Sequence, residues 1–373
     1  MDDEITDDQR VLLDASARFV DDTYPLTRVR ERAFDDGGFA TDYRRRAGEL
    51  GWYSLLVPEG LGGGSVSGNG VLDAALVAYT RGRTLQPDPF VGTNVVARAL
   101  ALAGTDEHRE KVLPALMAGD SSAAWVVAAP PGRPQLDGPA RAIAGSGTYM
   151  LTGHCTYVAA GDAHAWLLVT AATDGGPVQL LVPPETPGVR VVALDSLDLT
   201  RRYAEVHLDG VELPASSLVG TPGDADLVAD QLAIACALTV AESVGAMDRD
   251  FEMTVAYAKD RIAFGRPIGS FQAVKHLLAD MSLLLEMSKA VALAAARTLG
   301  TGDPYGPEAA SMAKAFVGDS GIDLAQNCFQ VFGGIGFTWE HDQHLYLRRL
   351  TTDAALFGDP AWHRERLCVL AGL

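Results

Sequence analysis

A single carboxylate in an apolar stretch is the first candidate for chemistry in this chain. Glu242 stands in the segment 238–246, and its neighbours one helical turn away are Leu238, Gly245 and Ala246. A carboxylate in such a setting is either a salt-bridged core residue or a desolvated base that faces a cavity left by the missing side chain at Gly245. Desolvation would raise its pKa toward the range in which a carboxylate abstracts protons effectively.

Two glycine-bearing corners carry a second kind of candidate. The segment 257–272 combines Arg261, Phe264 and a glycine where one predicted helix ends and the next begins. An arginine fork beside free backbone donors suits a phosphate or pyrophosphate, and the aromatic ring could stack on a ligand ring. The segment 330–337 is similar: Gln330 is followed by apolar residues and by glycines that let a ligand approach the backbone. Each segment is equally explained as a capped corner between helices.

Other motif-like segments do not support the chemistry that they suggest. The glycines of 60–64 lack the spacings of nucleotide-binding loops, which favours a plain helix connection. His341 and His344 share a helix face, but a zinc site requires a third protein ligand, so a polar helix start is the better interpretation and no metal site is predicted. The cysteines stand singly, which predicts buried free thiols in a reducing compartment. They are Cys155, Cys236, Cys328 and Cys368.

Three regions must position these candidates. The region 1–119 reads as helical, with acidic residues in the first turn of its first helix. Short apolar runs broken by Pro, Gly and Asp over 120–218 predict an antiparallel β domain. The region 219–373 reads as helical again. The further helices expected in the first region lie near 41–50, 71–83 and 91–118, and those in the last near 224–263, 271–299 and 308–331, with two shorter ones after them.

Composition excludes several classes of protein. The chain has 373 residues, 48% hydrophobic and 21% charged, as ordinary globular proteins do. Its net charge of −18 has the wrong sign for a nucleic-acid binder or for a protein that adheres to an anionic membrane. The acidic start lacks the pattern of a secretory signal, and no run approaches the roughly 18 apolar residues of a membrane span. We expect a cytoplasmic protein.

Taken together, these segments resemble the acyl-CoA dehydrogenase family over nearly the whole chain and in the right order. The resemblance rests on Arg261-x-x-Phe264-Gly265-x-Pro267-Ile268 with Phe271-Gln272, and on Gln330-Val331-Phe332-Gly333-Gly334-Ile335-Gly336-Phe337-Thr338-Trp339-Glu340. The continuation His341-Asp342-x-His344-Leu345-Tyr346 is similar to the bacterial, especially actinobacterial, branch used in steroid and acyl-CoA breakdown. The fold implied is α+β and multidomain: a helical N-domain, a β-barrel-like middle domain and a C-terminal four-helix bundle.

The resemblance implies FAD bound between subunits and α,β-dehydrogenation of an acyl-CoA thioester. A carboxylate would remove the α-proton while flavin N5 accepts the β-hydride, and electrons would leave through electron-transfer flavoprotein. The assembly implied is a homotetramer, or a heterotetramer with a paralogous subunit. The implied FAD contacts come from two neighbouring subunits: Arg261, Phe264 and Gln272 on the pyrophosphate and adenosine side, and Gln330, Gly333 and Gly334 from the other subunit.

Three departures from the family pattern bear on the site. The position at which many members carry the catalytic glutamate is Gly358 here. Relatives that lack this glutamate place it on the long helix, and the similarity of 241–245 to that version makes Glu242 the implied base. Two middle-domain motifs also differ: the aromatic-Ile-Thr-Asn motif is Tyr157-Val158-Ala159-Ala160, and Thr-Glu-Pro is replaced within Ala128-Ala129-Pro130-Pro131.

Four interpretations therefore stay open. The leading one is an FAD-dependent acyl-CoA dehydrogenase with Glu242 as base and, because of Gly245, a wide pocket for branched or ring-bearing acyl groups. The second is a partner subunit that is silent by itself or supplies half of a site. The third is a dehydrogenase acting on a carrier-protein thioester. The fourth is a flavin monooxygenase on the same fold.

Overall fold

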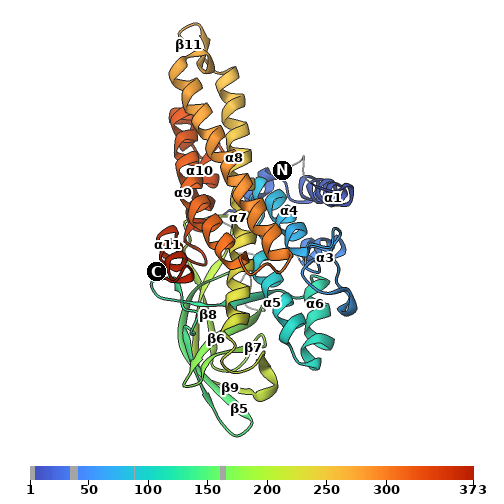
Figure 1. The fold of residues 1–373 in the computed structure, drawn as a ribbon. Helices are drawn as coiled ribbons and strands as arrows, with labels where there is room; N and C mark the ends of the chain where they lie inside the picture. Colours follow the sequence, from blue (N-terminus) through green and yellow to red (C-terminus); the bar gives the residue numbers. More distant parts are fainter. Residues whose placement is uncertain (1–4, 34–40, 88, 160–164) are drawn as a thin grey trace.

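Three regions of different secondary structure follow one another along the chain, in the order that the sequence predicts (Figure 1). The computed structural model describes residues 5–33, 41–87, 89–159 and 165–373. Helices form the first region, a mixed sheet the second and a long helical bundle the third. The sheet and the far tip of the bundle lie at opposite ends of the molecule (Figure 1).

The first region is built on short helices around an apolar core. Its helix α1 (Asp7–Thr23) begins at a capping box, in which the Thr6 hydroxyl accepts a hydrogen bond from the Gln9 amide and the Gln9 side chain accepts one from the Thr6 amide. The other helices are α2 (Leu26–Glu31), α3 (Thr41–Glu49), α4 (Gly70–Arg83), α5 (Phe90–Ala103) and α6 (Leu113–Met117).

One predicted helix of this region is divided. The expected helix over 91–118 stops at Ala103, because Gly104 adopts an extended conformation there. A Cβ at Gly104 would lie 2.4 Å from the Leu100 carbonyl oxygen, so this tight exit requires glycine. The chain resumes as a short π-helical turn, His108–Val112, before α6.

The second region is an eight-stranded sheet with strand order β10-β7-β6-β4-β5-β9-β8, in which β1 also pairs with β6. The predicted antiparallel pairing holds for most of the sheet, but β1 and β4 both pair with β6 in parallel. A parallel neighbour needs a long connection rather than a hairpin, and that pairing leaves no local signal in the sequence. The main strands are β1 (Ala123–Val126), β4 (Ala140–Ala144), β5 (Thr148–Val158), β6 (Trp166–Thr173), β7 (Gly176–Val182), β8 (Val189–Leu194), β9 (Tyr203–Pro214) and β10 (Leu218–Val219).

The third region is a bundle around one long, buried helix. Contrary to the expectation that no run approaches a membrane span, helix α7 is apolar and long enough to span one by length and composition. In the described part of the chain its apolar stretch is covered by α4, α8, α9 and α10. Its apolarity therefore serves the protein core. The helices of this region are α7 (Ala225–Asp260), α8 (Gln272–Gly300), α9 (Gly306–Phe332), α10 (Gln343–Ala355) and α11 (Pro360–Leu370).

The cysteines depart from the prediction at one position. Cys155, Cys236 and Cys328 are buried free thiols, as expected, and burial raises the pKa of each of them. Cys368 is exposed, because it lies on the open side of the terminal helix α11. The apolar residues around it in the sequence do not correspond to a buried helix face.

Candidate functional site

A cavity of about 760 Å³ lies between the sheet region and the helical bundle. One wall comes from the loops at 130–133 and 194–197 and from the end of β5 at 156–157. The other wall comes from the end of α10 and the turn that follows it, residues 351–359. It is large enough for part of a cofactor together with a substrate group.

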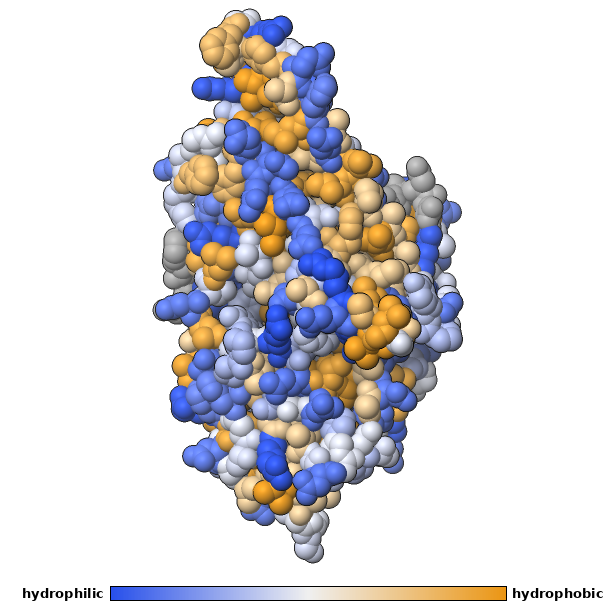
Figure 2. All heavy atoms as spheres, turned by 60° about the vertical axis from the view of Figure 1, so that its left-hand side comes forward, coloured by the Kyte–Doolittle hydropathy of each residue, from blue (hydrophilic) through white to orange (hydrophobic). Residues whose placement is uncertain are grey.

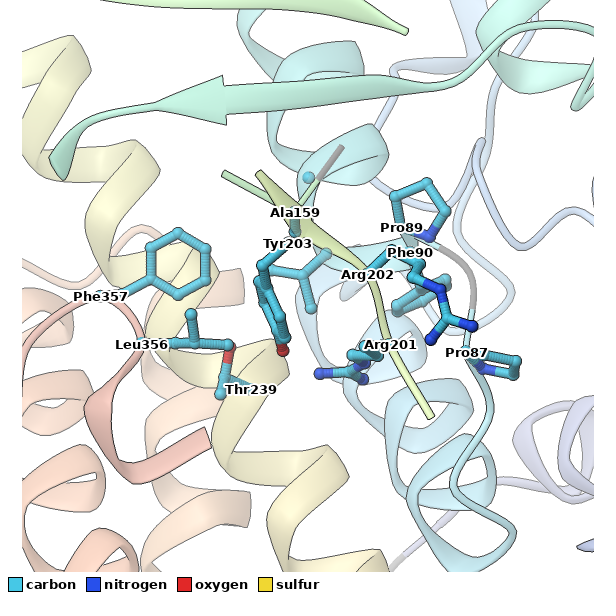
Figure 3. Close-up of a pocket in the computed structure, with 12 residues that line it drawn as sticks. Pro87, Pro89, Phe90, Ala159, Arg201, Arg202, Tyr203, Thr239, Leu356 and Phe357 are labelled. Atoms are coloured by element: carbon cyan, nitrogen blue, oxygen red, sulfur yellow. The ribbon is translucent and has the colours of Figure 1, made fainter. Parts of the chain in front are cut away.

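A second, narrower pocket adjoins this cavity, because Tyr203 and Leu356 line both. Its volume is about 30 Å³. Figure 3 shows the ring of Tyr203 projecting into it, with Thr239 of α7 on one side and the Arg201 guanidinium on the other. Phe90 of α5 contributes to the apolar wall (Figure 3). All three regions of the chain thus meet at this pocket.

The turn 356–359, which borders both spaces, is held by buried side chains. The ammonium of Lys314 donates hydrogen bonds to the carbonyl oxygens of Ala354 and Gly358, both at 2.9 Å. The Nε2 atom of His363 lies 3.1 Å from the Phe357 carbonyl oxygen. Phe357 has a φ of 57°, an uncommon backbone conformation for a non-glycine residue that persists only where the surroundings impose it.

Gly358 occupies the position at which the family resemblance expects a glutamate. Its φ of 107° disfavours any side chain. A Cβ there would lie 2.6 Å from the Trp362 ring and 2.9 Å from His363 Nε2. The local structure is therefore built around glycine, and a glutamate would not fit without rearrangement of the turn.

Glu242 is a buried ion-paired residue, the first of the two environments that the sequence allowed. Its side chain is fully buried, and Oε1 lies 3.2 Å from Arg81 Nε while Oε2 pairs with Arg201. Arg201 also donates a hydrogen bond to Asp353 at 3.0 Å. The carboxylate lies outside the described lining of both the cavity and the narrow pocket.

The expected desolvated environment of Glu242 is wrong in two respects. Burial alone would raise the pKa of the carboxyl, but the charges of Arg201, Arg81 and Arg349 outweigh burial and hold the pKa below its usual range. The expected cavity at Gly245 is absent as well, since a Cβ there would lie 2.0 Å from a carbonyl oxygen of α4. That position is a helix contact, so it gives no support for a wide acyl pocket.

The ion pairs around Glu242 continue into a larger buried network. Arg349 of α10 donates to Asp198 at 2.6 Å and to the carbonyl oxygens of Leu85 and Gln86 at 3.2 and 3.3 Å. Asp198 precedes β9, so the network joins the helical, sheet and bundle regions at one place. The charged members are Arg81, Asp198, Arg201, Glu242, Arg349 and Asp353.

The predicted FAD contacts gather at the opposite end of the bundle. Phe264 and Gln330 line one shallow apolar hollow of about 330 Å³. The hollow lies at the tip of the bundle, the end farthest from the sheet in Figure 1. Phe264 is 96% exposed and Arg261 is exposed too. Figure 2 shows apolar surface at this upper end of the molecule. The other three predicted contacts, Gln272, Gly333 and Gly334, are exposed and adjoin the same tip in the sequence.

The tip is a preformed corner. Strands β11 (Ile262–Ala263) and β12 (Arg266–Pro267) form a two-residue hairpin whose turn residues have φ angles of 51° and 77°. Such a turn favours glycine at both positions, and Phe264 holds the first one under strain with its ring in solvent. At Gly333 and Gly334 a Cβ would meet no atom within 4 Å, so the backbone is open to a ligand or to another chain.

The two middle-domain motifs that differ from the family pattern lie at the cavity and at the narrow pocket. Ala159 lines the narrow pocket, so the missing threonine hydroxyl leaves a methyl group there. Tyr157 has a φ of 53°, and its ring lies against Gly132, where a Cβ would be 2.3 Å away. Pro130 and the residues after it line the larger cavity. Ala160 lies outside the described residues.

One cluster on the sheet has the residue types of a metal site. His154 and His207 are paired across β5 and β9, and Nε2 of each lies 3.2 and 3.3 Å from the same oxygen of Glu205. The two rings are stacked with an interplanar angle of 13°, and both Nε2 atoms face that one carboxylate oxygen. The arrangement therefore satisfies the carboxylate as it stands.

Sequence reasoning missed the residues that form the narrow pocket. The segment 202–208 predicts a strand from its alternation, and β9 contains most of it. The same alternation gave no reason to single out Arg201 or Tyr203, because both are ordinary residues of a strand start. Their importance arises only when the start of β9 meets α7 and the turn after α10.

Models of known protein families match most of the chain. The family described as "Acyl-CoA dehydrogenase, N-terminal domain" matches residues 6–120, and "Acyl-CoA dehydrogenase, C-terminal domain" matches residues 225–368. The acyl-CoA dehydrogenase IpdE2 of Mycobacterium tuberculosis is 32% identical over 340 residues, which cover 91% of this chain and 89% of that protein.

Solved structures share the whole fold. A chain of the ChsE4-ChsE5 complex from Mycobacterium tuberculosis matches with a TM-score of 0.88 and 28% identity, covering 100% of this chain and 99% of that one. Butyryl-CoA dehydrogenase from Megasphaera elsdenii matches with a TM-score of 0.89 and 23% identity over 100% of both chains. The predicted fold, with its helical, sheet and bundle regions, is confirmed.

Proposed function

Because the chain belongs to the acyl-CoA dehydrogenase family, we propose that it dehydrogenates the α,β carbons of an acyl-CoA thioester, with FAD as its cofactor. The observation that carries this proposal is the 32% identity to an acyl-CoA dehydrogenase over nine-tenths of the chain, joined to a cavity between sheet and bundle. When bound, FAD accepts the hydride removed from the β carbon. Electron-transfer flavoprotein is the expected electron acceptor.

The residues present fit FAD only if two chains share it. At 1.5 Å per residue, α7 places the Arg261 tip about 28 Å along the helix axis from Glu242, which lies near the narrow pocket. The cavity and the tip therefore lie far apart within one chain. A tip from one chain that meets the cavity of another would bring Arg261, Phe264 and the open backbone at Gly333 to one end of the cofactor. The sheet side, with Arg133 at the cavity wall, would hold the other end.

A mixing experiment tests this sharing. Arg133→Glu alters only the cavity side, and Arg261→Glu alters only the tip. Each variant alone is expected to retain little FAD. Hybrid assemblies of the two contain one site in which both halves are intact, so they should regain up to half of the wild-type flavin content. No recovery in hybrids confirmed by native mass spectrometry would place both halves of the site on one chain.

Dehydrogenation itself has a direct assay. Anaerobic addition of a saturated acyl-CoA should bleach the flavin absorption, and the enoyl product should appear in equal amount. The monooxygenase alternative requires oxygen and a flavin reductase instead. Turnover that depends on both of these, with no anaerobic bleaching by any thioester, would overturn the proposal.

A second candidate function is a heteromeric enzyme, because neither Glu242 nor position 358 is well suited to supply the base. Proton abstraction by Glu242 stays a prediction, and its ion pairs and burial do not favour it. Gly358 excludes a glutamate without rearrangement, and the described lining of the narrow pocket contains no carboxylate. The larger cavity is lined by Asp195, Glu205 and Asp359, of which Glu205 faces two histidines and Asp359 caps α11. The 28% identical match to a chain of the ChsE4-ChsE5 complex is consistent with a chain that works beside a paralogue carrying its own base.

Expression alone and with a paralogous chain separates the two assemblies. A homomeric enzyme should purify yellow and active without a partner. A heteromeric one should bind FAD and turn over only when the second chain is present, with both chains in the purified complex. Native mass spectrometry reads the stoichiometry in each case.

A further inference from the structure

Three buried polar atoms of the narrow pocket have no hydrogen-bond partner among the described residues. They are Nε of Arg201, the hydroxyl of Tyr203 and Oγ1 of Thr239. Their residues are 8%, 2% and 1% exposed, respectively. Buried polar groups in proteins are nearly always paired, because an unpaired one costs free energy. Three such atoms around one pocket indicate a polar ligand group.

The pocket limits the size of that group. Its volume of about 30 Å³ holds roughly two water-sized groups. Phe90, Leu356 and Phe357 line it with apolar surface, so carbon atoms can follow the polar group inward. In Figure 3 the Tyr203 hydroxyl lies between the Thr239 hydroxyl and the Arg201 guanidinium. The pocket therefore suits one substituent of a larger ligand that occupies the adjoining cavity.

The donors define the chemistry of that substituent. Arginine has no acceptor atom, so Nε of Arg201 requires a hydrogen-bond acceptor. Burial raises the pKa of Tyr203, so its hydroxyl stays protonated and can donate as well. Thr239 can donate or accept. A keto oxygen or a hydroxyl oxygen satisfies all three side chains, whereas an alkyl group satisfies none.

The charge of the buried network beside the pocket disfavours an anion next to Arg201. Arg202, the other cation of the pocket lining, donates to the Leu199 carbonyl oxygen at 3.3 Å. Arg201 already faces Glu242 and Asp353, so its charge is neutralised before any ligand binds. The larger network balances as well, with three arginines against three carboxylates. A carboxylate on the ligand would be repelled by the three carboxylates of the network. Each arginine among the described members of the network already faces one of those carboxylates. A neutral oxygen carries no such cost.

We propose that this pocket receives a neutral keto or hydroxyl oxygen on the acyl part of the thioester, and that Arg201, Tyr203 and Thr239 select acyl groups that carry one. This inference rests on the proposed function, since the thioester must occupy the adjoining cavity. A pocket built to hydrogen-bond an oxygen discriminates strongly against the analogue without it, because its buried donors then stay unpaired. Glu242 and Asp353 act as positioning residues that hold the Arg201 guanidinium.

The carbonyl oxygens of the flavin ring offer the same acceptor chemistry, and the experiment separates them from the acyl group. Pairs of saturated acyl-CoA thioesters with the same carbon skeleton, with and without one keto or hydroxyl oxygen, are titrated into the holoenzyme by calorimetry and assayed for flavin reduction. A third thioester of each set carries a carboxylate. FAD affinity is measured separately on the apoprotein. The variants are Tyr203→Phe and Thr239→Val, which remove only donor groups.

We expect the wild-type protein to prefer the oxygenated thioester by at least tenfold over both the plain and the carboxylated one. Each variant should lose about tenfold of its affinity for the oxygenated member and little for the plain one, corresponding to about 1.4 kcal/mol. FAD affinity should not change. Because these hydroxyls have no hydrogen-bond partner in the part of the chain that the structure describes, neither variant should lower the Tm.

Matched variants at buried sites outside the pocket supply the control. Tyr346→Phe removes a hydroxyl that donates to the Arg83 carbonyl oxygen at 2.7 Å, and Thr254→Val removes one that donates to the Asp250 carbonyl oxygen at 2.8 Å. Both should lower the Tm and leave the preference between thioesters intact. Equal affinity of the wild-type protein for both members of every pair would overturn the inference. So would weaker FAD binding in Tyr203→Phe with an unchanged preference, since the flavin would then be the ligand.

The two proposals fail in different ways. If no thioester reduces the flavin but oxygenated thioesters still bind preferentially through Tyr203, the dehydrogenase proposal fails and the pocket inference stands. If plain thioesters are turned over as well as oxygenated ones, the dehydrogenase proposal stands and the pocket inference fails.

Discussion

A Cβ atom on Gly245 would lie 2.0 Å from the carbonyl oxygen of Tyr79. Helices α7 and α4 therefore meet backbone to backbone at this point. The contact is reciprocal, because a Cβ on Gly82 of α4 would lie 1.9 Å from the Glu242 carbonyl oxygen. This close approach seals Glu242 and Arg81 into the core. In the sequence, Gly245 suggested a cavity beside Glu242. In the structure, the missing side chain lets the α4 backbone fill that place.

The first prediction concerns this helix contact. Gly245→Ala places a methyl group against rigid backbone, and overpacking of this kind typically costs 1–3 kcal/mol. We expect the free energy of unfolding to fall by at least about 2 kcal/mol in denaturant titrations. Gly60→Ala is the control, since a Cβ there meets no atom within 4 Å. An unchanged stability of Gly245→Ala would mean that α4 and α7 are further apart than described.

The second prediction distinguishes the two interpretations of Glu242. Glu242→Gln leaves Arg81 and Arg201 without their shared carboxylate in a buried place. Removing one partner of a buried ion pair costs about 3–5 kcal/mol, so we expect a loss of about 3 kcal/mol in the free energy of unfolding. Chemical denaturation of the holoenzyme measures it.

The control for this change is an exposed glutamate. Glu286 on α8 pairs with Lys289 at 3.1 Å and is 66% exposed, so Glu286→Gln should change stability by less than about 1 kcal/mol. If Glu242 is the catalytic base, Glu242→Gln should instead keep the stability and FAD content of the wild-type protein and lose dehydrogenation. That pattern would restore the base assignment.

The architecture was predictable because it depends on local patterns. The long apolar stretch without proline predicts α7, and the glycines after Phe332 mark the end of α9. The parallel pairing of β1 with β6 was not predictable, since strands distant in the chain carry no mark of their partner. Helix periodicity also could not show that Gly104 divides the expected helix over 91–118.

The candidate site also has a part that could be predicted from local sequence and a part that could not. The tip residues Arg261 and Gln330 could be identified because their motifs are continuous in the sequence. The environment of Glu242 could not, because its partners Arg81 and Arg201 are 161 and 41 residues away in the chain. A pKa depends on those partners, and apolar neighbours along one helix suggested a shift in the wrong direction.

The third prediction concerns the turn beside the cavity. Lys314 is 2% exposed, burial lowers its pKa to about 8, and its ammonium holds the carbonyl oxygens of Ala354 and Gly358. Lys314→Met removes both hydrogen bonds but also relieves the burial of a charge, so global stability should change little. Two buried carbonyl groups without donors favour local opening, by about 1–3 kcal/mol each. Amide hydrogen exchange of residues 356–359 should therefore accelerate at least tenfold.

The exposed Lys111 is the matched control for that measurement. It pairs with Glu107 one helical turn away and is 70% exposed, so Lys111→Met should leave exchange at 356–359 unchanged. Unaltered exchange in Lys314→Met as well would show that the turn is held by other contacts.

The fourth prediction is a pH dependence that originates at His363. Burial, together with the nearby charge of Lys314, lowers the pKa of this imidazole from 6.5 to about 3. Between pH 6.5 and about 3 the unfolded chain binds a proton that the folded chain does not, so stability falls as the pH falls through this window. His363→Gln removes this proton and retains a donor for the Phe357 carbonyl oxygen. Relative to the wild-type protein, the variant should therefore gain roughly 2 kcal/mol between pH 6 and pH 4 in unfolding titrations at each pH. A constant difference between the two proteins across that range would show that His363 takes up its proton in the folded state, and hence that the turn at 357 opens to water.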